Sequence, residues 1–191
     1  MKKENKQNNN KPAHSPIIIS GGSGAIGTAL TKHFLSNNVP VLNLDKTQGE
    51  ISLDVPGYTF FQIDASNENS VKETMKKIFA ECHVKPKKFV NCSGKIYSEP
   101  VISIQAGKLA AHNFENLKLV VEANFYSSFL TSSYFAKELI ANRENGVIVN
   151  LSSISHFGNR GQAAYSAMKA AVNSMTTSMA KELGDFGIRV V

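Results

Sequence analysis

The chain has 191 residues, 42% of them hydrophobic and 19% charged, which is enough for one globular domain with a sizeable core and too little for two. It contains no apolar run near the roughly 20 residues that cross a membrane, so we expect no transmembrane segment. The net charge is +6, but half of this excess lies in residues 1–15, so the composition does not favour nucleic-acid binding by the folded part.

Residues 1–15 read MKKENKQNNNKPAHS, with almost no side chain that a core could bury. This composition predicts a disordered polar tail, with the folded domain in residues 16–191. A secretory signal would need an apolar stretch after the lysines, where asparagines stand instead. A transit peptide would be rich in arginine, and residues 1–15 contain none. The two cysteines are too few to staple a domain of this size, which favours a reducing, cytoplasmic location.

From Pro16 onward, short apolar runs rich in β-branched and aromatic residues alternate with longer helical patterns. The runs predict strands at residues 16–20, 39–45, 58–64, 88–94, 146–153 and 188–191. In the helical patterns, apolar residues recur at a spacing of three or four, which places them on one side of a helix. These patterns predict helices that contain Ile26 to Phe34 and Val71 to Cys82, and two more over residues 112–142 and 162–183.

Strands that alternate with helices form βαβ units, in which helices cover both faces of a parallel sheet. Nearly continuous apolar strands such as VIVNL agree with this, because parallel strands are buried on both sides. We therefore predict an α/β fold with a Rossmann-like, doubly wound parallel sheet. The chain stops early in the last predicted strand, so we expect the final strand or strands of such a sheet to be missing.

The sequence SGGSGAIG, residues 20–27, stands between the first strand and the first helix. Such a turn can bring the backbone N–H groups of a helix N-terminus against a pyrophosphate, from which a Cβ atom would hold them away. A loop that merely needs positive φ angles is the alternative, and the turn by itself does not decide between the two. The dinucleotide contacts predicted from it are Gly21, Ser23, Gly24, Ala25, Ile26 and Gly27.

An acid follows the glycine turn at an informative distance. Asp45 ends the second predicted strand 18 residues after Gly27, close to the roughly 20 residues at which an acid binds the adenosine ribose hydroxyls. A carboxylate there repels a 2′-phosphate, which favours NAD(H) over NADP(H). Lys46 weakens this preference, because an adjacent cation could accept that phosphate, so NADP(H) stays an alternative.

Tyr165 and Lys169 lie four residues apart in the predicted 162–183 helix, so their side chains point the same way. Such a pair is common by chance, but the motifs around it are not. The chain resembles the short-chain dehydrogenase/reductase superfamily across nearly all of residues 16–191, and the motifs that carry the resemblance are the glycine turn, Asp45, Asp64, NCSG at 91–94, Asn124, VNLSS at 149–153 and YSAMK at 165–169. Each motif is weak by itself, but their order and spacing together are specific.

The resemblance implies an oxidoreductase that transfers a hydride between NAD or NADP and an alcohol or carbonyl group. Tyr165 would be the general acid/base on the substrate oxygen, while Lys169 would favour its phenolate form and bind the nicotinamide ribose. Ser153 would hydrogen-bond the substrate carbonyl, and Asn124 would hold a water that links Lys169 to solvent. Asp64 would contact the adenine. The remaining implied cofactor contacts are Lys46, Ala65, Asn91, Ser93, Gly94 and Tyr165 itself.

Two departures from the family pattern leave alternatives open. Ala25 stands where the shorter members carry the second glycine, and the observed glycine spacing is more typical of sugar epimerases and dehydratases of the superfamily. Counting back from Tyr165 favours Ser152 as the active serine, whereas the strand end VNLSS favours Ser153. We prefer Ser153, because the strand fixes which face its side chain uses.

The third departure lies at the end of the chain. Related chains continue through a segment that contacts the nicotinamide, a helical flap over the substrate and a final strand, and this sequence stops at Val191. A non-catalytic dinucleotide-binding fragment or scaffold is therefore an alternative function, beside an epimerase or dehydratase.

Partners and metals complete the expectations. The five histidines show no ligand spacing with one another or with a cysteine, so we expect no metal site. Family members usually pair subunits through the helices that contain residues 112–142 and 162–183, so the resemblance implies a homodimer or homotetramer. The expected partner is a small alcohol or carbonyl substrate, with neither a nucleic acid nor a membrane.

Overall fold

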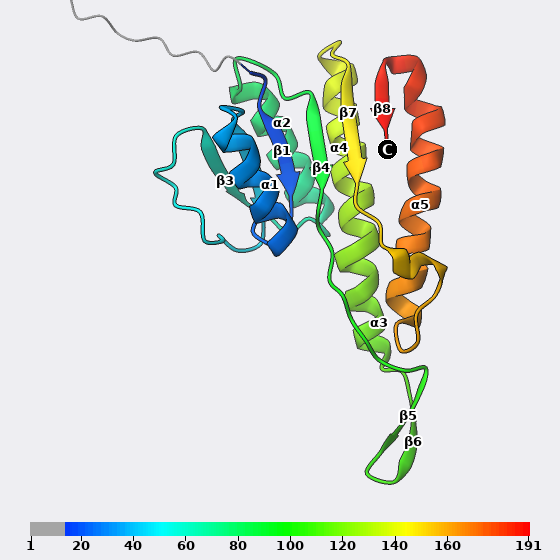
Figure 1. Cartoon of the computed structure of the whole chain (residues 1–191). Coiled ribbons are helices and arrows are strands. Elements are labelled where there is room, and N and C mark those ends of the chain that lie inside the picture. The colour runs from blue at the N-terminus through cyan, green and yellow to red at the C-terminus, as the bar shows by residue number, and fades with distance from the viewer. Residues whose placement is uncertain (1–13) are drawn as a thin grey trace, which may run out of the picture.

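The computed structural model describes residues 14–191, so the predicted polar tail falls almost wholly outside the described residues. Within this range the chain forms a six-stranded sheet between two layers of helices, and a small hairpin projects from one end (Figure 1). The strand order is β3-β2-β1-β4-β7-β8, and every pairing in this sheet is parallel. The predicted doubly wound α/β fold is confirmed.

The strands are shorter than the runs that predicted them. The runs 58–64, 88–94, 146–153 and 188–191 lose their last residues, whereas 16–20 and 39–45 lose their first. The strands of the large sheet are β1 (Ile17–Ser20), β2 (Val41–Asp45), β3 (Tyr58–Gln62), β4 (Lys88–Asn91), β7 (Gly146–Asn150) and β8 (Ile188–Val190). The α-helices are α1 (Ala25–Ser36), α2 (Glu68–Glu81), α3 (Phe114–Val121), α4 (Ser127–Ala141) and α5 (Ala163–Leu183). Among the described residues, no helix combines the length and the hydrophobicity needed to span a membrane.

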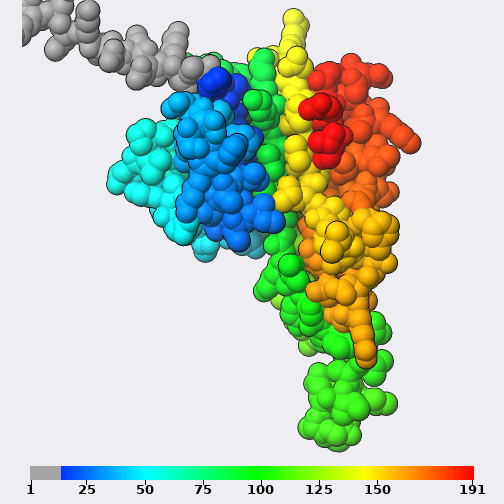
Figure 2. Space-filling view, in the orientation of Figure 1, coloured from blue at the N-terminus to red at the C-terminus, as the bar shows by residue number. Residues whose placement is uncertain are grey.

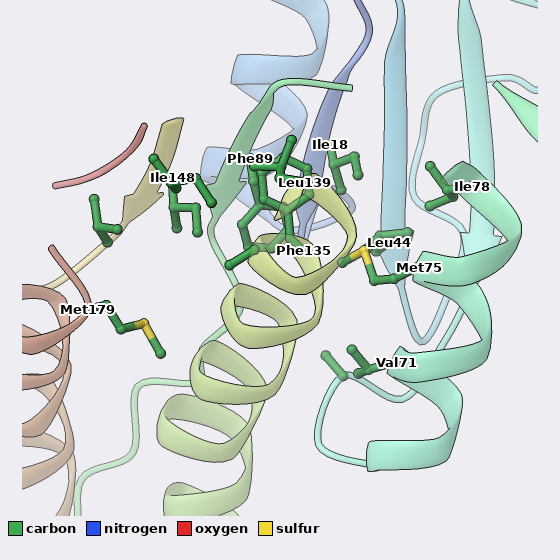
Figure 3. Packing of buried hydrophobic residues seen from close by; sticks show 14 of the residues in the cluster. Ile18, Leu44, Val71, Met75, Ile78, Phe89, Phe135, Leu139, Ile148 and Met179 are labelled. Carbon is green, nitrogen blue, oxygen red and sulfur yellow. The ribbon is translucent and has the colours of Figure 1, made fainter. Parts of the chain in front are cut away.

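The larger part of the core lies between one face of the sheet and the helices α2, α4 and α5 (Figure 3). Phe89 of β4 stacks on Phe135 of α4 with ring centroids 5.3 Å apart, and both side chains are fully buried. The predicted stripe of α2 is buried at Val71, Met75, Ile78 and Phe79. A smaller cluster joins Ile17, Ile19 and Val41 to α1 on the other face.

The pattern predicted for the first helix is only partly buried. Leu30 and Phe34 pack against the smaller cluster, but Ile26 is 59% exposed, and the buried residues of α1 are Gly27 and Thr31. Gly27 is buried because it lies against the backbone of Gly21 and Gly22 in the turn.

The predicted helix over residues 112–142 is interrupted. Helix α3 leads into a π-helical turn, η1 (Glu122–Tyr126), before α4 begins. Single π-turns inside helices often mark functional sites, because they displace one side chain from the regular ladder. Here the displaced segment contains Asn124, one of the predicted catalytic residues.

The sequence reading missed a two-stranded antiparallel hairpin, β5 (Ile102–Gln105) and β6 (Lys108–Ala111). Its turn uses Ala106 and Gly107 with φ angles of 49° and 77°, the left-handed conformation of tight hairpin turns. Figure 2 shows the hairpin as a narrow extension beyond the body of the protein. Short 3₁₀ turns complete the fold at η2 (Ile154–Phe157) and η3 (Gly184–Phe186).

Candidate active site

The carboxyl ends of the parallel strands meet at one edge of the sheet, and a cleft of about 540 Å³ opens there. This volume is typical of a small-molecule site. From β1 the sheet continues in two directions, to β2 and β3 on one side and to β4, β7 and β8 on the other. The cleft lies at this change of direction, which is the usual position for ligands in open α/β sheets. The predicted cofactor contacts that line it are Gly21, Ser23, Gly24, Asp45, Lys46, Asp64, Ala65, Ser93 and Gly94.

The glycine turn has no room for side chains at three of its positions. A Cβ on Gly21, which has φ +73°, would lie 2.7 Å from the backbone nitrogen of Ser93. A Cβ on Gly27 would lie 2.2 Å from the carbonyl oxygen of Gly21, and one on Gly22 would overlap the side chain of Asn43. The backbone itself therefore forms this wall, and α1 begins beside it with no side-chain cap on its N-terminus. Such a cradle suits an anion like pyrophosphate.

Ser23 is fixed inside the turn by two side chains of β2. The Ser23 N–H donates to the Asp45 carboxylate over 3.0 Å, and the Asn43 amide donates to the Ser23 hydroxyl over 3.1 Å. Asn43 is 1% exposed, and its amide also donates to the Tyr58 hydroxyl over 2.8 Å. The sequence reading missed Asn43, although a polar residue inside the apolar strand VLNLD was a signal.

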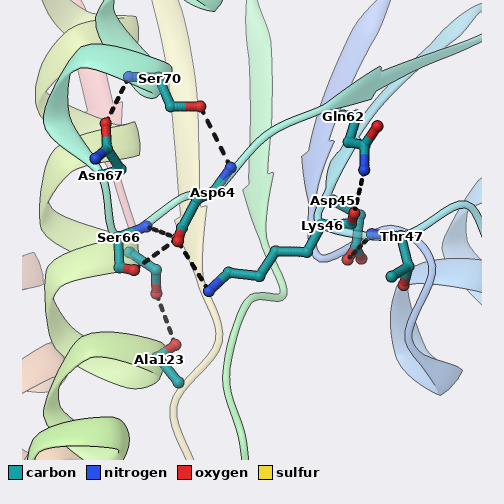
Figure 4. Close-up of polar contacts among 10 residues, drawn as sticks. Asp45, Lys46, Thr47, Gln62, Asp64, Ser66, Asn67, Ser70 and Ala123 are labelled. Atoms are coloured by element: carbon teal, nitrogen blue, oxygen red, sulfur yellow. Dashed lines mark hydrogen bonds and ion pairs between the residues drawn. The ribbon is translucent and has the colours of Figure 1, made fainter.

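The end of the cleft beside β2 and β3 carries charged side chains (Figure 4). The Lys46 ammonium lies 3.0 Å from the Asp64 carboxylate, which also accepts hydrogen bonds from the backbone and hydroxyl of Ser66. Burial raises the pKa of Asp64, but the Ser66 hydrogen bonds and the Lys46 charge outweigh it, so the pKa lies below its usual value. Asp64 is therefore ionised at neutral pH.

One of the predicted cofactor contacts in NCSG does not face the cleft. The Asn91 amide is buried and donates to the Ser128 carbonyl and the Thr131 hydroxyl of α4, and its side chain does not line the cleft. Cys92 does line the cleft, and burial raises the pKa of its thiol to about 11. Ala25 and Ile26 also lie outside the residues that line the cleft.

Lys169 is the most buried cation at the site. Its side chain comes from α5, the residue is 5% exposed, and its ammonium donates to the Leu151 carbonyl over 2.9 Å. Tyr165 lies one turn earlier on α5, with the ammonium 5.8 Å from its ring centroid. Burial lowers the pKa of Lys169, and the neighbouring Cys92 thiol opposes this.

Asn124 faces Lys169 across Gly94. The Asn124 amide donates to the carbonyls of Lys95 and Val120, and its oxygen accepts from the Lys95 N–H over 3.2 Å. A Cβ on Gly94 would lie 2.8 Å from the Asn124 amide oxygen and 3.3 Å from the Lys169 ammonium. Gly94 also lines the cleft, so it joins the predicted cofactor site to the predicted catalytic residues.

The two candidate serines make different hydrogen bonds. The Ser152 hydroxyl donates to the Lys169 carbonyl over 3.1 Å, which commits its proton to α5. The Ser153 hydroxyl accepts from the Ser155 N–H over 3.1 Å, where it caps η2. The proton of the Ser153 hydroxyl is not used in this bond, so it can be donated to another group.

Residues 14–191 contain no cluster of three or more histidine, cysteine or acidic side chains that could hold a metal ion. His156, next to the serines, places its Nδ1 atom 2.6 Å from the Ser153 carbonyl. That contact belongs to the turn η2.

A family model described as short chain dehydrogenase matches residues 15–191. Sorbitol-6-phosphate 2-dehydrogenase of Klebsiella pneumoniae is 34% identical over 180 residues, which cover 92% of this chain and 66% of that protein. The 3-hydroxyacyl-CoA dehydrogenase type-2 of Drosophila melanogaster is 31% identical over 186 residues, which cover 91% of this chain and 71% of that protein. The chain thus spans about two thirds of the length of these relatives.

Solved structures of dehydrogenases are also similar to this chain. A short chain dehydrogenase from Leptospira borgpetersenii serovar Hardjo-bovis with bound NAD+ matches with a TM-score of 0.82 at 25% identity, covering 92% of this chain and 68% of that one. A 4-hydroxyisoleucine dehydrogenase complexed with NADH matches with a TM-score of 0.77 at 29% identity, covering 93% and 73%. Both similarities extend over more than nine tenths of this chain.

Proposed function

This chain belongs to the short chain dehydrogenase family, and we propose on that basis that it transfers a hydride between a nicotinamide dinucleotide and an alcohol or carbonyl substrate. The observation that carries the proposal is the position of Gly94. It lines the cleft and also lies against the Asn124 amide and the buried Lys169 ammonium. The proposed nucleotide site would therefore adjoin the side chains that we propose handle the proton.

The backbone of the glycine turn supports a dinucleotide as the ligand of the cleft. The glycine turn offers a wall without side chains and the uncapped N-terminus of α1, which together would hold the pyrophosphate. Asp45 would bind the adenosine ribose hydroxyls, which supports NAD(H) as the cofactor, with NADP(H) as the alternative. When bound, the nicotinamide supplies or accepts the hydride.

The side chains beside Gly94 would handle the proton. Tyr165 is the proposed general acid/base at the substrate oxygen, and the buried Lys169 ammonium would stabilise its phenolate form. Ser153 would donate its free hydroxyl proton to the substrate oxygen, whereas the Ser152 proton is committed to α5. Asn124 would hold the backbone of Lys95 in place and support a water that relays protons to Lys169.

An epimerase or dehydratase has weaker support from the glycine spacing. A Cβ on Gly24 would meet only the Gly21 carbonyl at 3.4 Å, an ordinary contact distance, so the middle glycine of that spacing is not required by packing. The spacing therefore does not by itself point to a different reaction.

The test is the substitution Tyr165→Phe, which removes one hydroxyl group. We expect NADH binding, measured by nicotinamide fluorescence, to stay within about twofold of the wild type. Oxidation of NADH with a panel of carbonyl substrates should fall by roughly 10² to 10⁴, the usual contribution of a general acid/base. Tyr134→Phe is the matched control, because the Tyr134 hydroxyl donates to Glu68 at the surface.

The outcomes separate the candidate functions. Undiminished turnover by the Tyr165→Phe variant would contradict the mechanism. Wild-type protein that binds NADH and turns over none of the panel would favour the non-catalytic binding function. Tightly retained NAD with no net change in its redox state during turnover would favour an epimerase.

We also propose that a second copy of the chain covers the face of α4 and α5. A groove of about 750 Å³ lies between these helices, with Phe125, Phe129, Met175 and Met179 in its lining. Phe129 is 45% exposed there. Phe129→Glu should give a smaller species in light scattering, whereas Phe157→Glu, at an 87% exposed position outside the groove, should not. A wild-type monomer at micromolar concentration would contradict the proposal.

A cytoplasmic location is the last part of the proposal. Cys82 and Cys92 are both free thiols, as expected of a protein in a reducing compartment. Cell fractionation tests it, and recovery of the protein in a membrane or secreted fraction would contradict it.

A further inference from the structure

We propose that Asp64 strengthens the preference for NAD(H) over NADP(H) indirectly, by holding the Lys46 ammonium away from the adenosine ribose. The inference rests on the proposed function, because it takes the cleft as the adenosine site. Asp64 is then a positioning residue that acts through Lys46, in addition to any contact of its own with the adenine.

The topology brings the two residues together at the rim of the cleft (Figure 4). Lys46 directly follows β2, and Asp64 lies just beyond β3. Since β2 and β3 are parallel neighbours with Asp45 opposite Gln62, both residues leave the sheet at the same edge. The Lys46 ammonium lies 3.0 Å from one oxygen of the Asp64 carboxylate.

Neighbouring groups hold both members of this ion pair. The Gln62 amide donates to the Lys46 carbonyl over 3.1 Å, which fixes the backbone from which the lysine side chain extends. The other oxygen of Asp64 accepts from the Ser66 N–H over 2.9 Å and from the Ser66 hydroxyl over 2.6 Å. The carboxylate is thus oriented towards Lys46 before any ligand enters.

Asp45 does not hold the Lys46 ammonium. Its carboxylate accepts the Ser23 N–H of the glycine turn over 3.0 Å and the Thr47 N–H at 3.5 Å, and the ion pairs among residues 14–191 include none between Asp45 and Lys46. The two consecutive charges therefore face different parts of the cleft. A 2′-phosphate on the ribose would meet the Asp45 carboxylate, while the cation that could compensate for it is held by Asp64.

The size of the effect follows from exposure. The side chains of Lys46 and Asp64 are 64% and 45% exposed, so water and salt screen their attraction. Exposed ion pairs change equilibrium constants by at most about fivefold. Freeing Lys46 should therefore change the cofactor preference by about two- to fivefold, and raising the salt concentration should reduce the change.

The experiment measures the dissociation constants of NADH and NADPH by fluorescence titration of the whole chain. The proteins are the wild type, Asp64→Asn, Lys46→Met and the double variant. Both cofactors carry the same adenine, so a direct contact between Asp64 and adenine cancels in the ratio of the two constants. A double-mutant cycle on that ratio isolates the part that passes through Lys46.

We expect Asp64→Asn to shift the ratio towards NADPH by about two- to fivefold and Lys46→Met to shift it towards NADH. In the Lys46→Met background, Asp64→Asn should have no further effect on the ratio. Glu144→Gln is the control for added charge, because it breaks the 2.6 Å ion pair with Lys87 at the opposite ends of the strands. Its ratio should equal that of the wild type.

An unchanged ratio in Asp64→Asn would overturn the inference and leave the proposed function intact. The same holds if the shift persists without Lys46 or if Glu144→Gln reproduces it. Absence of NADH and NADPH binding by the folded wild-type chain would instead contradict the proposed function, and this inference with it.

Discussion

The glycine turn and the cluster around Lys169 meet at Gly94, but they are built in opposite ways. The turn is shaped by missing atoms, since a Cβ on Gly27 would lie 2.2 Å from the Gly21 carbonyl oxygen. The cluster is shaped by buried polar groups, with the Lys169 ammonium on a backbone carbonyl and the Asn124 amide on two others. Adding one carbon should therefore break the first, and removing one polar group should break the second.

The contrast predicts how each part tolerates change. A packed backbone cannot move aside for a new atom, so the turn should fail through geometry. A buried hydrogen-bonding group loses its partner when the partner is removed, so the cluster should fail through unpaired polar atoms and lost charge. The following predictions test that division, beginning with the largest expected effect.

Lys169→Met should lower turnover by roughly 10² to 10⁴, because it removes the charge that would stabilise the Tyr165 phenolate. NADH affinity should fall much less, since neither Lys169 nor any other residue of α5 lines the cleft. The pKa of Lys169 is lowered by burial, so its charge is lost at a lower pH than the ordinary value of 10.5. Wild-type activity that depends on the ammonium should therefore decline as the pH rises through that lowered value.

Steady-state kinetics and fluorescence titration across pH measure both effects. Lys181→Met on the same helix, outside the cluster, is the control. Equal losses of turnover and of NADH affinity would show that Lys169 supports the cleft rather than the chemistry, and the division between the two regions would not hold.

Cys92 lies beside Gly21 of the glycine turn and near Lys169, so its reactivity depends on both regions. Its thiol has a pKa of about 11 against an ordinary value of 9.0, so at pH 8 the reactive thiolate is about a hundredfold scarcer than in an unperturbed thiol. Alkylation of Cys92 by iodoacetamide should therefore accelerate about tenfold per pH unit up to about pH 11. Bound NADH should slow the reaction at Cys92, which lines the cleft, and not at Cys82.

Mass spectrometry of the two cysteine peptides measures this directly, with Cys82 as the internal control. Rapid labelling of Cys92 at pH 7 would show that the thiol is not buried as described. Equal protection of both cysteines by NADH would show that the ligand acts through global stability and not through the cleft.

Gly27→Ala should destabilise the protein by about 1 to 3 kcal/mol, the usual cost of forcing an atom into a packed site, and weaken NADH binding. Gly24→Ala is the matched control in the same turn, because its Cβ would meet only the Gly21 carbonyl at an ordinary 3.4 Å. Thermal unfolding and NADH titration of both variants compare them. If the two alanines were equally tolerated, the view that packing defines the turn would be wrong.

Much of the cleft lining could be predicted from the sequence because it depends on short motifs. Gly21, Asp45 and Gly94 each stand at or after the carboxyl end of a strand, and parallel pairing brings such ends to one edge. Side-chain directions were less accessible. Asn91 was expected to line the cofactor, but its buried amide is turned to α4.

Other features depend on contacts between distant residues. The π-turn at residues 122–126 accompanies hydrogen bonds between Asn124 and the backbone of Lys95, which no local pattern encodes. The ion pair between Lys46 and Asp64 requires that β2 and β3 be neighbours. The hairpin β5–β6 was missed although ISIQ, residues 102–105, alternates apolar and polar side chains and is followed by Ala106 and Gly107. The signal is short, with only four residues in each strand.

The hairpin extends the comparison to a segment that neither region needs. None of residues 102–111 is buried, and Ile104 and Leu109, which pair across it, are 75% and 79% exposed. Replacing residues 102–111 by a short Gly-Ser linker should therefore change NADH affinity less than about twofold, the smallest effect predicted here. The Glu99 carboxylate would still accept the Asn113 N–H at the base, so the path from Gly94 to α3 should keep its course.

Fluorescence titration and thermal unfolding of the hairpin variant measure this. A loss of NADH binding would mean that the hairpin holds Gly94 in place from outside, and the cleft would then depend on a segment with no buried contacts. Retained binding with altered carbonyl turnover would locate the influence of the hairpin on the substrate side. In that case the cluster around Lys169 would depend on a segment outside the core, and the glycine turn would not.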